Sequence, residues 1–431
     1  MKKTVLTILL ILGITAQSAF AQEYDLDQFL DLVKLHSKNI KLAEQDIAMA
    51  KAMKKEAVSG ALPYISGFAG YDRNFRDIYS YFEMGDEYSK IRVNRKNDYY
   101  AGVALNQTLL NGTVFNAIKA AKQYEKMTDF IYEASVQEIL TYAKKAYHQT
   151  ILLKNVRDIA AASEANALEN YRDVQKAFDI GLVSEFSLLQ AEVRHKGTIP
   201  QTTEAEKNYR LALSNIKNMA GIPSGEKITL SGDLSEYPAL PPDESLENIL
   251  AQRPDYAALS WEEKLLNTNV SANKAAHYPS LTGSLSYQFS AQSDEWAFEE
   301  RNNTLTAGVY LNIPIFSGGA TRARVQQARV DLEKSRISLA RTRDDIETEV
   351  LDVRLRLTEA RNRIESAQAT LQTARKAFSI AEINAKAGLI TQLNLKDSRI
   401  TLDQAQVNYL SALYEYLAAY YDWEKTIGQA G

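Results

Sequence analysis

Two long runs without glycine or proline constrain this chain more than any other feature. They cover residues 113–180 and 320–387, and each is 68 residues long. Gly112 precedes the first run and Gly319 precedes the second, so the two starts lie 207 residues apart. A run free of helix-breaking residues predicts one continuous helix, about 100 Å long at about 1.5 Å per residue. Two equal runs in register indicate an internal repeat.

The repeat is expected to extend over the whole mature chain. Within each half, the predicted order is helix, strand, loop, strand, long helix, turn, helix. We divide the sequence into a signal peptide at 1–21, a first structural repeat at 22–222, a linker at 223–243 and a second structural repeat at 244–431. The linker holds four of the nine prolines and is expected to be irregular.

The N-terminus has the pattern of a secretory signal peptide. Lys2 and Lys3 form a basic start, residues 5–14 form an apolar core, and Ala19 and Ala21 provide a small-residue cleavage site. We therefore expect cleavage after Ala21. No other stretch reaches the ~18 apolar residues of a spanning helix, so any further membrane contact is expected to be non-helical.

Composition argues against an enzyme, a metalloprotein and a nucleic-acid-binding protein. The absence of Cys excludes disulfides, thiolate catalysis, Cys-based zinc sites and a cysteine-linked lipid anchor. No two of the four His lie at a metal-ligand spacing. The formal net charge of −4 does not favour a nucleic-acid partner. We expect no catalytic residues, no metal site and no cofactor.

Helix breakers predict interruptions in the shorter helices. The first helix is expected at about 27–61, and its partner in the second half at about 244–276. Pro254 lies inside the partner and should kink or restart it. Gly197 and Pro200 should likewise break the last helix of the first half.

The second long run carries the heptad pattern of a coiled coil. Its apolar residues recur at alternating spacings of three and four, and many of them are alanines, which let helices approach closely. An upstream stripe in another phase repeats every seven residues. The main seam is Val350, Val353, Leu357, Ala360, Ile364, Ala367, Leu371, Ala374, Phe378 and Ala381, and the upstream stripe is Val325, Leu332, Leu339 and Ile346.

Each half also contains two short segments in which apolar and polar residues alternate. This period of two predicts strands with one apolar and one polar face. The clearest segments are 281–289 and 305–315, and weaker copies lie at 64–71 and 100–109. The polar loops that join each pair are expected at 72–98 and 290–303.

Two arrangements fit these strands. They could form ordinary hairpins packed on the helices, or, at about ten residues each, they could span a membrane in a β-barrel. Four strands cannot close a barrel alone, and open sheet edges do not occur in lipid. Two chains would supply eight strands and three would supply twelve. Because a barrel of about eight strands is filled by side chains, a trimer with a twelve-stranded barrel is expected if the strands span a membrane.

A set of short motifs, duplicated and in order, gives the chain a resemblance to a known family. The motifs are Arg253-Pro254-Asp255, the helix-to-strand junctions Leu62-Pro63-Tyr64-Ile65 and Tyr278-Pro279-Ser280-Leu281, the strand-to-helix junction from Leu311 to Gly319, and the turns Gly181-Leu182 and Gly388-Leu389. With them, the chain resembles the outer-membrane efflux protein family, the TolC-like proteins, over nearly all of its mature sequence.

The resemblance implies a mainly α-helical fold with a small antiparallel β part. A trimeric, twelve-stranded outer-membrane β-barrel would continue into a long periplasmic α-helical barrel. The implied function is the exit duct of a tripartite efflux pump in the cell outer membrane, a passive channel for small molecules. Its implied partners are two further copies of the chain, a periplasmic adaptor protein, an inner-membrane pump and outer-membrane lipid, with no nucleic acid.

The resemblance also implies roles for residues at the two turns. In such proteins the turns meet the adaptor, and the matching residues are Ile180, Gly181, Leu182, Ser184, Ala387, Gly388, Leu389 and Thr391. Some members narrow the tunnel with acidic side chains just past the second turn, and the matching positions are Asn394 and Asp397. Asp397 keeps the acidic type and Asn394 departs from it. Three copies of Asp397 would form a carboxylate ring that favours cations.

Two other functions remain open from the sequence. On the same fold, the chain could be the exit duct of a type I protein secretion system. A soluble periplasmic coiled-coil scaffold would explain the helices without a membrane, although the alternating strand pairs argue against it. Neither the cargo nor the class of pump is indicated by the sequence.

Overall fold

The computed structural model describes residues 22–84 and 87–429. The predicted signal peptide and its cleavage site therefore lie outside the described residues. The protein is mainly helical with a smaller antiparallel β part, as the sequence predicts. The chain divides into two compact units. The larger unit contains the described residues up to Glu44, Ile131–Tyr256 and the residues from Thr342 onward, and the smaller unit contains Gln45–Phe130 and Ala257–Arg341.

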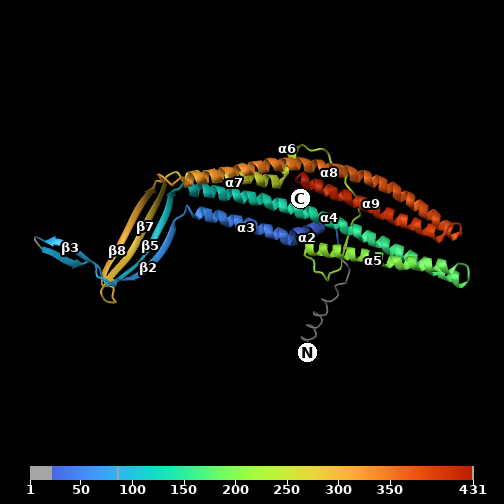
Figure 1. Cartoon of the computed structure of the whole chain (residues 1–431), viewed down its shortest axis with the longest axis horizontal. Coiled ribbons are helices and arrows are strands. Elements are labelled where there is room, and N and C mark those ends of the chain that lie inside the picture. Colours follow the sequence, from blue (N-terminus) through green and yellow to red (C-terminus); the bar gives the residue numbers. More distant parts are fainter. Residues whose placement is uncertain (1–21, 85–86, 430–431) are drawn as a thin grey trace, which may run out of the picture. The chain divides into compact units, whose positions relative to one another are not determined.

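The smaller unit contains a four-stranded antiparallel sheet (Figure 1). Its strands are β2 (Tyr64–Arg73), β5 (Asn97–Leu110), β7 (Ser280–Ser293) and β8 (Glu300–Asn312), in the order β2-β5-β7-β8. Each half of the chain contributes two adjacent strands, and β5 pairs with β7 at the centre. All four predicted strands are present, with most of the difference in bounds at the loop ends.

The loop predicted at 72–98 is not irregular throughout. It contains a second antiparallel hairpin, β3 (Tyr79–Met84) and β4 (Glu87–Arg92). The loop predicted at 290–303 is also shorter than expected, because β7 and β8 continue into it. The residues of β3 mix aromatic and polar types on both faces, so alternation does not reveal the strand.

Glycines in the sheet explain why alternation in the first strand pair is weak. A Cβ added to Gly70 would lie 2.3 Å from the ring of Tyr100, and one added to Gly102 would lie 2.7 Å from the ring of Phe68. Each aromatic ring therefore covers a glycine on the neighbouring strand, and the two rings themselves lie 6.5 Å apart. An aromatic side chain on one strand thus packs over a glycine, which has no side chain, on the next strand.

Both long runs form single helices, as predicted. Helix α4 (Gly112–Asp179) has 68 residues and α8 (Ala320–Lys386) has 67. Together with α3 (Lys38–Ser59), they contribute residues to both units. Within the smaller unit, α7 (Pro254–Ala275) packs against α8 through Val270 and Leu332, and the second residue belongs to the predicted upstream stripe.

The larger unit adds the remaining helices and a minimal parallel sheet. The helices are α2 (Leu26–His36), α5 (Glu185–Ala220), α6 (Leu246–Gln252) and α9 (Gln392–Thr426). Strand β1 (Gln22–Tyr24) pairs in parallel with β6 (Ile228–Leu230), which lies within the linker predicted to be irregular. As predicted, Pro254 restarts a helix, since it opens α7 immediately after α6.

The prediction of one helix over 27–61 is wrong. Ser37 has non-helical backbone dihedrals, with φ of −56° and ψ of 122°, and separates α2 from α3. Its amide closes α2 on the carbonyl of Val33, and its Oγ accepts the Ile40 amide 3.4 Å away at the start of α3. Serine side chains compete with helical hydrogen bonds in this way. A single serine within a polar stretch carries no signal as strong as glycine or proline.

The predicted break at Gly197 and Pro200 is also wrong, because α5 continues through both residues. Proline removes one backbone hydrogen bond, and packing of a long helix tolerates that loss. Threonine hydroxyls surround the site: Thr198 Oγ1 donates to the carbonyl of His195 at 2.7 Å, and Thr203 Oγ1 donates to that of Ile199 at 2.9 Å. These threonine hydroxyls therefore donate hydrogen bonds to backbone carbonyls next to the position where Pro200 leaves a helical hydrogen bond unmade.

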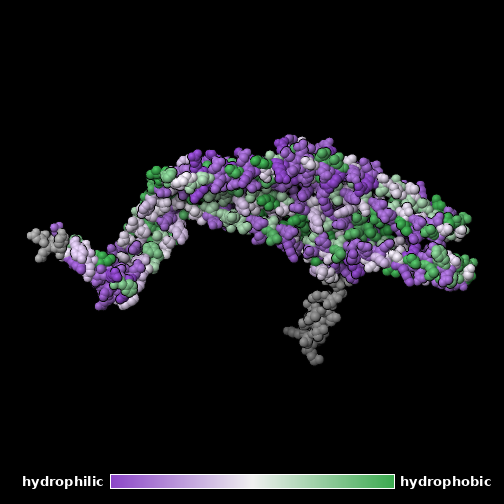
Figure 2. Space-filling view, in the orientation of Figure 1, coloured by the Kyte–Doolittle hydropathy of each residue, from purple (hydrophilic) through white to green (hydrophobic). Residues whose placement is uncertain are grey.

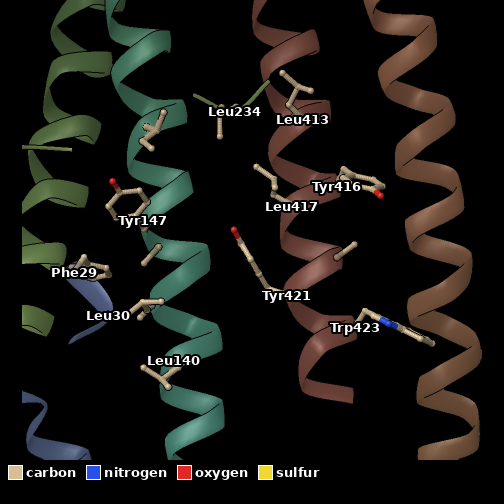
Figure 3. Packing of buried hydrophobic residues seen from close by; sticks show 14 of the residues in the cluster. Phe29, Leu30, Leu140, Tyr147, Leu234, Leu413, Tyr416, Leu417, Tyr421 and Trp423 are labelled. Carbon is tan, nitrogen blue, oxygen red and sulfur yellow. The ribbon is translucent and has the colours of Figure 1, made fainter. Parts of the chain in front are cut away.

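Buried aromatic and aliphatic residues form the core of the larger unit (Figure 3). Phe29 of α2 packs against Tyr147 of α4, with ring centroids 5.6 Å apart. The hydroxyl of Tyr147 lies 2.8 Å and 2.7 Å from the carbonyl oxygens of Tyr24 and Ser231, and so anchors the small parallel sheet. Tyr416 of α9 donates to the linker carbonyl of Pro238 at 2.9 Å.

The predicted heptad seam of α8 is confirmed by burial. Six of its residues are buried: Val353, Leu357, Ala360, Ile364, Leu371 and Ala374. Helix α9 supplies the facing residues at the same spacing, and these include Leu402, Ala405, Tyr409, Leu413 and Tyr416. The seam therefore joins α8 to α9 as a coiled-coil pair.

The Arg253-Pro254-Asp255 motif fixes the joint between α6 and α7. The Arg253 side chain is buried, with only 6% of the residue exposed. Its guanidinium lies 2.7 Å from an Asp255 oxygen and 2.8 Å from a Glu349 oxygen on α8, and it donates to the carbonyl of Thr426 at the end of α9. Burial opposes ionisation of Asp255, but the bonds from Arg253 hold its pKa below the ordinary value.

The two turns that follow the long helices share one geometry. Gly181 has a φ of +76° and Gly388 has a φ of +73°. The next residue in each turn donates its amide to the carbonyl five residues earlier, at 2.8 Å for Leu182 and 2.9 Å for Leu389. This is the Schellman end of a helix, in which glycine takes the left-handed conformation without a Cβ penalty.

This geometry predicts opposite effects of adding a Cβ at two glycines. We expect Gly388→Ala to lower the free energy of unfolding by about 1 kcal/mol, because its backbone is left-handed. Gly197→Ala should raise it by up to about 1 kcal/mol, because Gly197 lies inside a helix and its Cβ would meet no atom within 4 Å. Chemical unfolding of the purified variants measures both. Equal effects would contradict the turn geometry.

The second prediction concerns His148 on α4. Its Nδ1 lies 3.0 Å from the Lys144 carbonyl, and its ring lies 5.4 Å from that of Tyr421 on α9. Burial lowers the pKa of His148 below its ordinary 6.5. The unfolded chain therefore binds the proton first, and stability is lost as pH falls below about 6.5.

We expect the free energy of unfolding to drop by about 1 kcal/mol more in the wild type than in His148→Gln between pH 7.5 and 5.5. Urea unfolding at several pH values measures this slope. His277→Gln is the control, because it removes a histidine whose side chain is exposed. A wild-type slope in the His148 variant would show that this side chain does not titrate with folding.

Candidate functional site

The two turns present apolar side chains to solvent. Ile180 and Leu182 are 72% and 73% exposed, and Leu389 is 74% exposed. Figure 2 shows hydrophobic surface at the turn ends of the helical hairpins. Asn170 near the end of α4 donates to Gln392 at the start of α9 at 3.1 Å, so the two hairpins are neighbours close to the turns. Exposed leucines at adjacent turns form a surface suited to contact with another protein.

Polar residues at the turns cap the returning helices. Ser184 is the N-cap of α5, and Thr391 is the N-cap of α9. The Thr391 side chain accepts the amide of Asn394 and also bonds to the Asn394 side chain. In the same way, the Ser184 side chain accepts the amide of Ser187 and also bonds to the Ser187 side chain. Asn394 therefore takes part in the cap of α9, and this role explains a polar residue at that position.

Asp397 lies one turn further along α9 and is exposed. Asp397 acts on the charge of Arg194 in α5. Burial lowers the pKa of Arg194, and the negative charges of Asp403 and Asp397 oppose that shift. The geometry brings Asp397 and Arg194 into one electrostatic cluster. Sequence analysis did not identify Arg194, because a single arginine on a charged helix has no distinguishing pattern.

The same cluster joins helices α4, α5 and α9. Asp403 accepts a hydrogen bond from Ser163 of α4 at 2.8 Å and pairs with Arg399 at 2.9 Å. Arg194 Nη1 is buried and has no hydrogen-bond partner among the described residues. A cavity of about 1000 Å³ opens beside these residues, with Leu189 and Ile400 among its apolar lining. The polar contacts hold the second hairpin against the first.

The sheet has two chemically different faces. One register row across the four strands is Ile65, Leu105, Leu285 and Ala307, and the next is Gly67, Val103, Tyr287 and Leu305. The opposite face carries rows such as Ser66, Ala104, Ser286 and Thr306. The apolar face is open: Leu305 is 70% exposed and Val309 is 67% exposed. Apolar residues on a sheet are ordinarily covered by another layer.

The described residues contain neither a membrane-spanning helix nor a cluster of metal-binding side chains. In the ranges 22–84 and 87–429, no helix is long and apolar enough to cross a membrane. Within the same part of the chain, no group of three or more His, Asp or Glu residues is placed to hold a metal ion.

Comparisons with curated proteins find relatives of low identity. The chain is 24% identical over 266 residues to the alkaline protease secretion protein AprF of Pseudomonas aeruginosa, a match that covers 61% of this chain and 54% of that protein. It is 23% identical over 278 residues to the outer membrane protein TolC of Vibrio cholerae. This match covers 63% of this chain and 60% of that protein. The matches thus span little more than half the length of these relatives.

Solved structures show the same fold over almost the whole chain. The CmeC outer membrane channel of Campylobacter jejuni aligns with a TM-score of 0.77 at 21% identity, covering 94% of this chain and 86% of that one. The outer membrane protein VceC of Vibrio cholerae aligns with a TM-score of 0.75 at 16% identity, covering 94% of this chain and 96% of that one.

The family profile named Outer membrane efflux protein matches residues 29–222 and again residues 245–429. Proteins of this group are channels of the outer membrane and not enzymes. The chain therefore belongs to the outer membrane efflux protein family, the TolC-like proteins.

Proposed function

We propose that the protein is the exit duct of a tripartite efflux pump. In this proposal it is a passive channel for small molecules, which an inner-membrane pump drives through a periplasmic adaptor. The observation that carries the proposal is the sheet, whose exposed face is apolar while its opposite face is polar. Such a sheet fits a barrel that faces lipid outside and water inside.

The proposed assembly is a trimer. The sheet order leaves β2 and β8 as its two edges, and open edges are not tolerated in lipid. Strands of 10 to 14 residues are long enough to span the hydrocarbon at a tilt of about 45°. If β8 of one copy pairs with β2 of the next, three copies close a twelve-stranded barrel wide enough for a channel. The helices would continue it as a periplasmic α-helical barrel.

The proposal includes an internal duplication, with repeats at 22–222 and 244–431 joined by a linker at 223–243. Two observations support it. The family profile matches two successive segments of the chain. Each half also contributes two strands, one very long helix and one returning helix of similar length. A duplicated half explains why both turns have the same backbone geometry.

We assign the turns to the adaptor contact. The proposed residues are Ile180, Gly181, Leu182, Ser184, Ala387, Gly388, Leu389 and Thr391. Their exposed apolar side chains support this assignment, because leucines exposed to water at both turns do not stabilise an isolated chain. For the pore constriction we propose Asn394 and Asp397, with Asp397 as the charged member. Single-channel conductance of Asp397→Ala tests this role, and unchanged cation conductance would remove it.

A second candidate shares the same fold. The relative AprF is named as an alkaline protease secretion protein, and PrtF of Dickeya chrysanthemi is named as a proteases secretion protein. These names favour the exit duct of a type I protein secretion system as the alternative. Crosslinking at the turns, followed by identification of the captured adaptor, distinguishes an efflux partner from a protein-secretion partner.

A charge on the apolar face of the sheet should prevent assembly. We expect Leu305→Lys to reduce trimer in the outer membrane severely, because a Lys facing lipid costs about 2–4 kcal/mol near the bilayer centre. Thr306→Lys is the matched control, since the adjacent residue belongs to the polar face and should assemble normally. Membrane fractionation and the size of the detergent-extracted protein measure both. Equal behaviour of the two variants would contradict the assignment of faces.

A charge at a turn should weaken adaptor binding without affecting assembly. We expect Leu389→Asp to reduce crosslinking to the adaptor by about tenfold, as for loss of a buried apolar contact at an interface. Thr373→Asp is the control, because Thr373 is an exposed residue of α8 outside the turn. Wild-type crosslinking and drug resistance in both Leu389→Asp and Leu182→Asp would remove the turns from the adaptor contact.

A further inference from the structure

Aromatic rings and arginines gather at the loop end of the apolar sheet face. In the register, Tyr71 lies opposite Tyr99, Tyr99 opposite Ala291, and Ala291 opposite Arg301. This row lies on the same face as Val103 and Leu305. Those two residues lie two rows closer to the helices. We define the aromatic-basic patch as Tyr71, Arg73, Tyr99, Trp296, Phe298 and Arg301.

The rings of the patch pack on one another and remain open to the surroundings. Tyr71 lies 5.1 Å from Tyr99 and 5.3 Å from Trp296, and Tyr99 lies 4.7 Å from Phe298. Ala291, which lies between Tyr99 and Arg301 in the register, is fully buried. Trp296 is nevertheless 75% exposed. Aromatic residues with an apolar body and a polar tip favour the boundary between hydrocarbon and head groups.

A buried asparagine holds the patch in place. Asn97 has no exposed surface, and its Oδ1 accepts hydrogen bonds from the Tyr71 hydroxyl at 2.9 Å and from Arg73 at 3.0 Å. Its Nδ2 donates to the carbonyls of Ser293 and Glu295 at 3.2 Å and 2.8 Å. One side chain thus ties β2 to the loop that carries Trp296. The patch is a preorganised surface and not a set of mobile loop residues.

Within residues 22–84 and 87–429, no carboxylate pairs with the two arginines of the patch. Among the described residues, neither Arg73 nor Arg301 forms an ion pair with a carboxylate. Arg73 lies over the Trp296 ring, and Arg301 Nε donates to the Phe298 carbonyl at 2.7 Å. In contrast, the nearby Arg92 and Arg95 pair with Asp294 and Glu300. Two unpaired guanidiniums beside exposed rings are complementary to an anion attached to an apolar body.

We propose that the aromatic-basic patch binds the phosphate-bearing head group of an anionic lipid in the outer leaflet. The inference rests on the proposed function, in which the apolar sheet face contacts lipid. The helices leave the sheet at one end and would lie in the periplasm, so the patch at the other end faces outward. Arg73 and Arg301 lie on the two edge strands, so each would engage a separate phosphate of the head group, while the rings contact the acyl chains and the sugar.

Native mass spectrometry of the whole, detergent-extracted protein tests the proposal. Delipidated protein is titrated with bis-phosphorylated lipid A, with phosphatidylcholine and with inorganic phosphate. We expect lipid A to bind about tenfold or more tightly than phosphatidylcholine, since each arginine near a lipid surface favours anionic lipid. The double variant R73Q/R301Q should bind lipid A no better than phosphatidylcholine. R73K/R301K, which keeps both charges, should retain most of the binding.

The control is R76Q, which removes an exposed arginine of the same loop region outside the patch. Wild-type binding of lipid A by R73Q/R301Q would overturn the proposal, and so would equal loss in R76Q. Binding of inorganic phosphate as tight as that of lipid A would overturn the assignment to a lipid. The same spectra report the number of chains, so failure of the trimer is seen separately from failure of the patch.

Discussion

Backbone hydrogen bonding at the edges of the four-stranded sheet is the constraint on which the proposed architecture depends. Strands β2 and β8 expose their outer edges, and the apolar face beside them is suited to lipid. Lipid supplies no partners for backbone amides and carbonyls, so in the proposed assembly the edges pair with further copies of the chain. That pairing would close the barrel, and each copy would contribute its helices to one continuous conduit.

In the larger unit, a different set of contacts packs the very long helices side by side. The seam of α8 fits α9 through alternating large and small residues such as Leu357 and Ala360. Tyr147 and Tyr416 donate hydrogen bonds to the chain that links the halves, so the linker is fixed to the helices. Arg253 ties the α6–α7 joint to α8 and α9. These contacts are few, buried and specific, while most charged side chains remain on the surface.

Features with strong periodicity were predictable, and features that depend on one tertiary contact were not. The absence of breakers predicted α4 and α8 almost to the residue, and the three-four spacing predicted which face of α8 is buried. The break predicted at Pro200 was wrong, because tertiary packing outweighed a single lost hydrogen bond. Ser37, Asn97 and Arg194 escaped notice because each acts through partners distant in sequence or through a local cap. The two turns were identified from Gly-Leu pairs, whereas the capping role of Asn394 needed the structure.

The decisive measurement for the trimeric barrel is the mass of the detergent-extracted protein from outer membranes. We expect a particle with three times the mass of the mature chain, because only three copies complete twelve strands and leave an open channel. A monomer or dimer recovered without membranes would contradict it, and the exposed apolar face of the sheet would then need another covering.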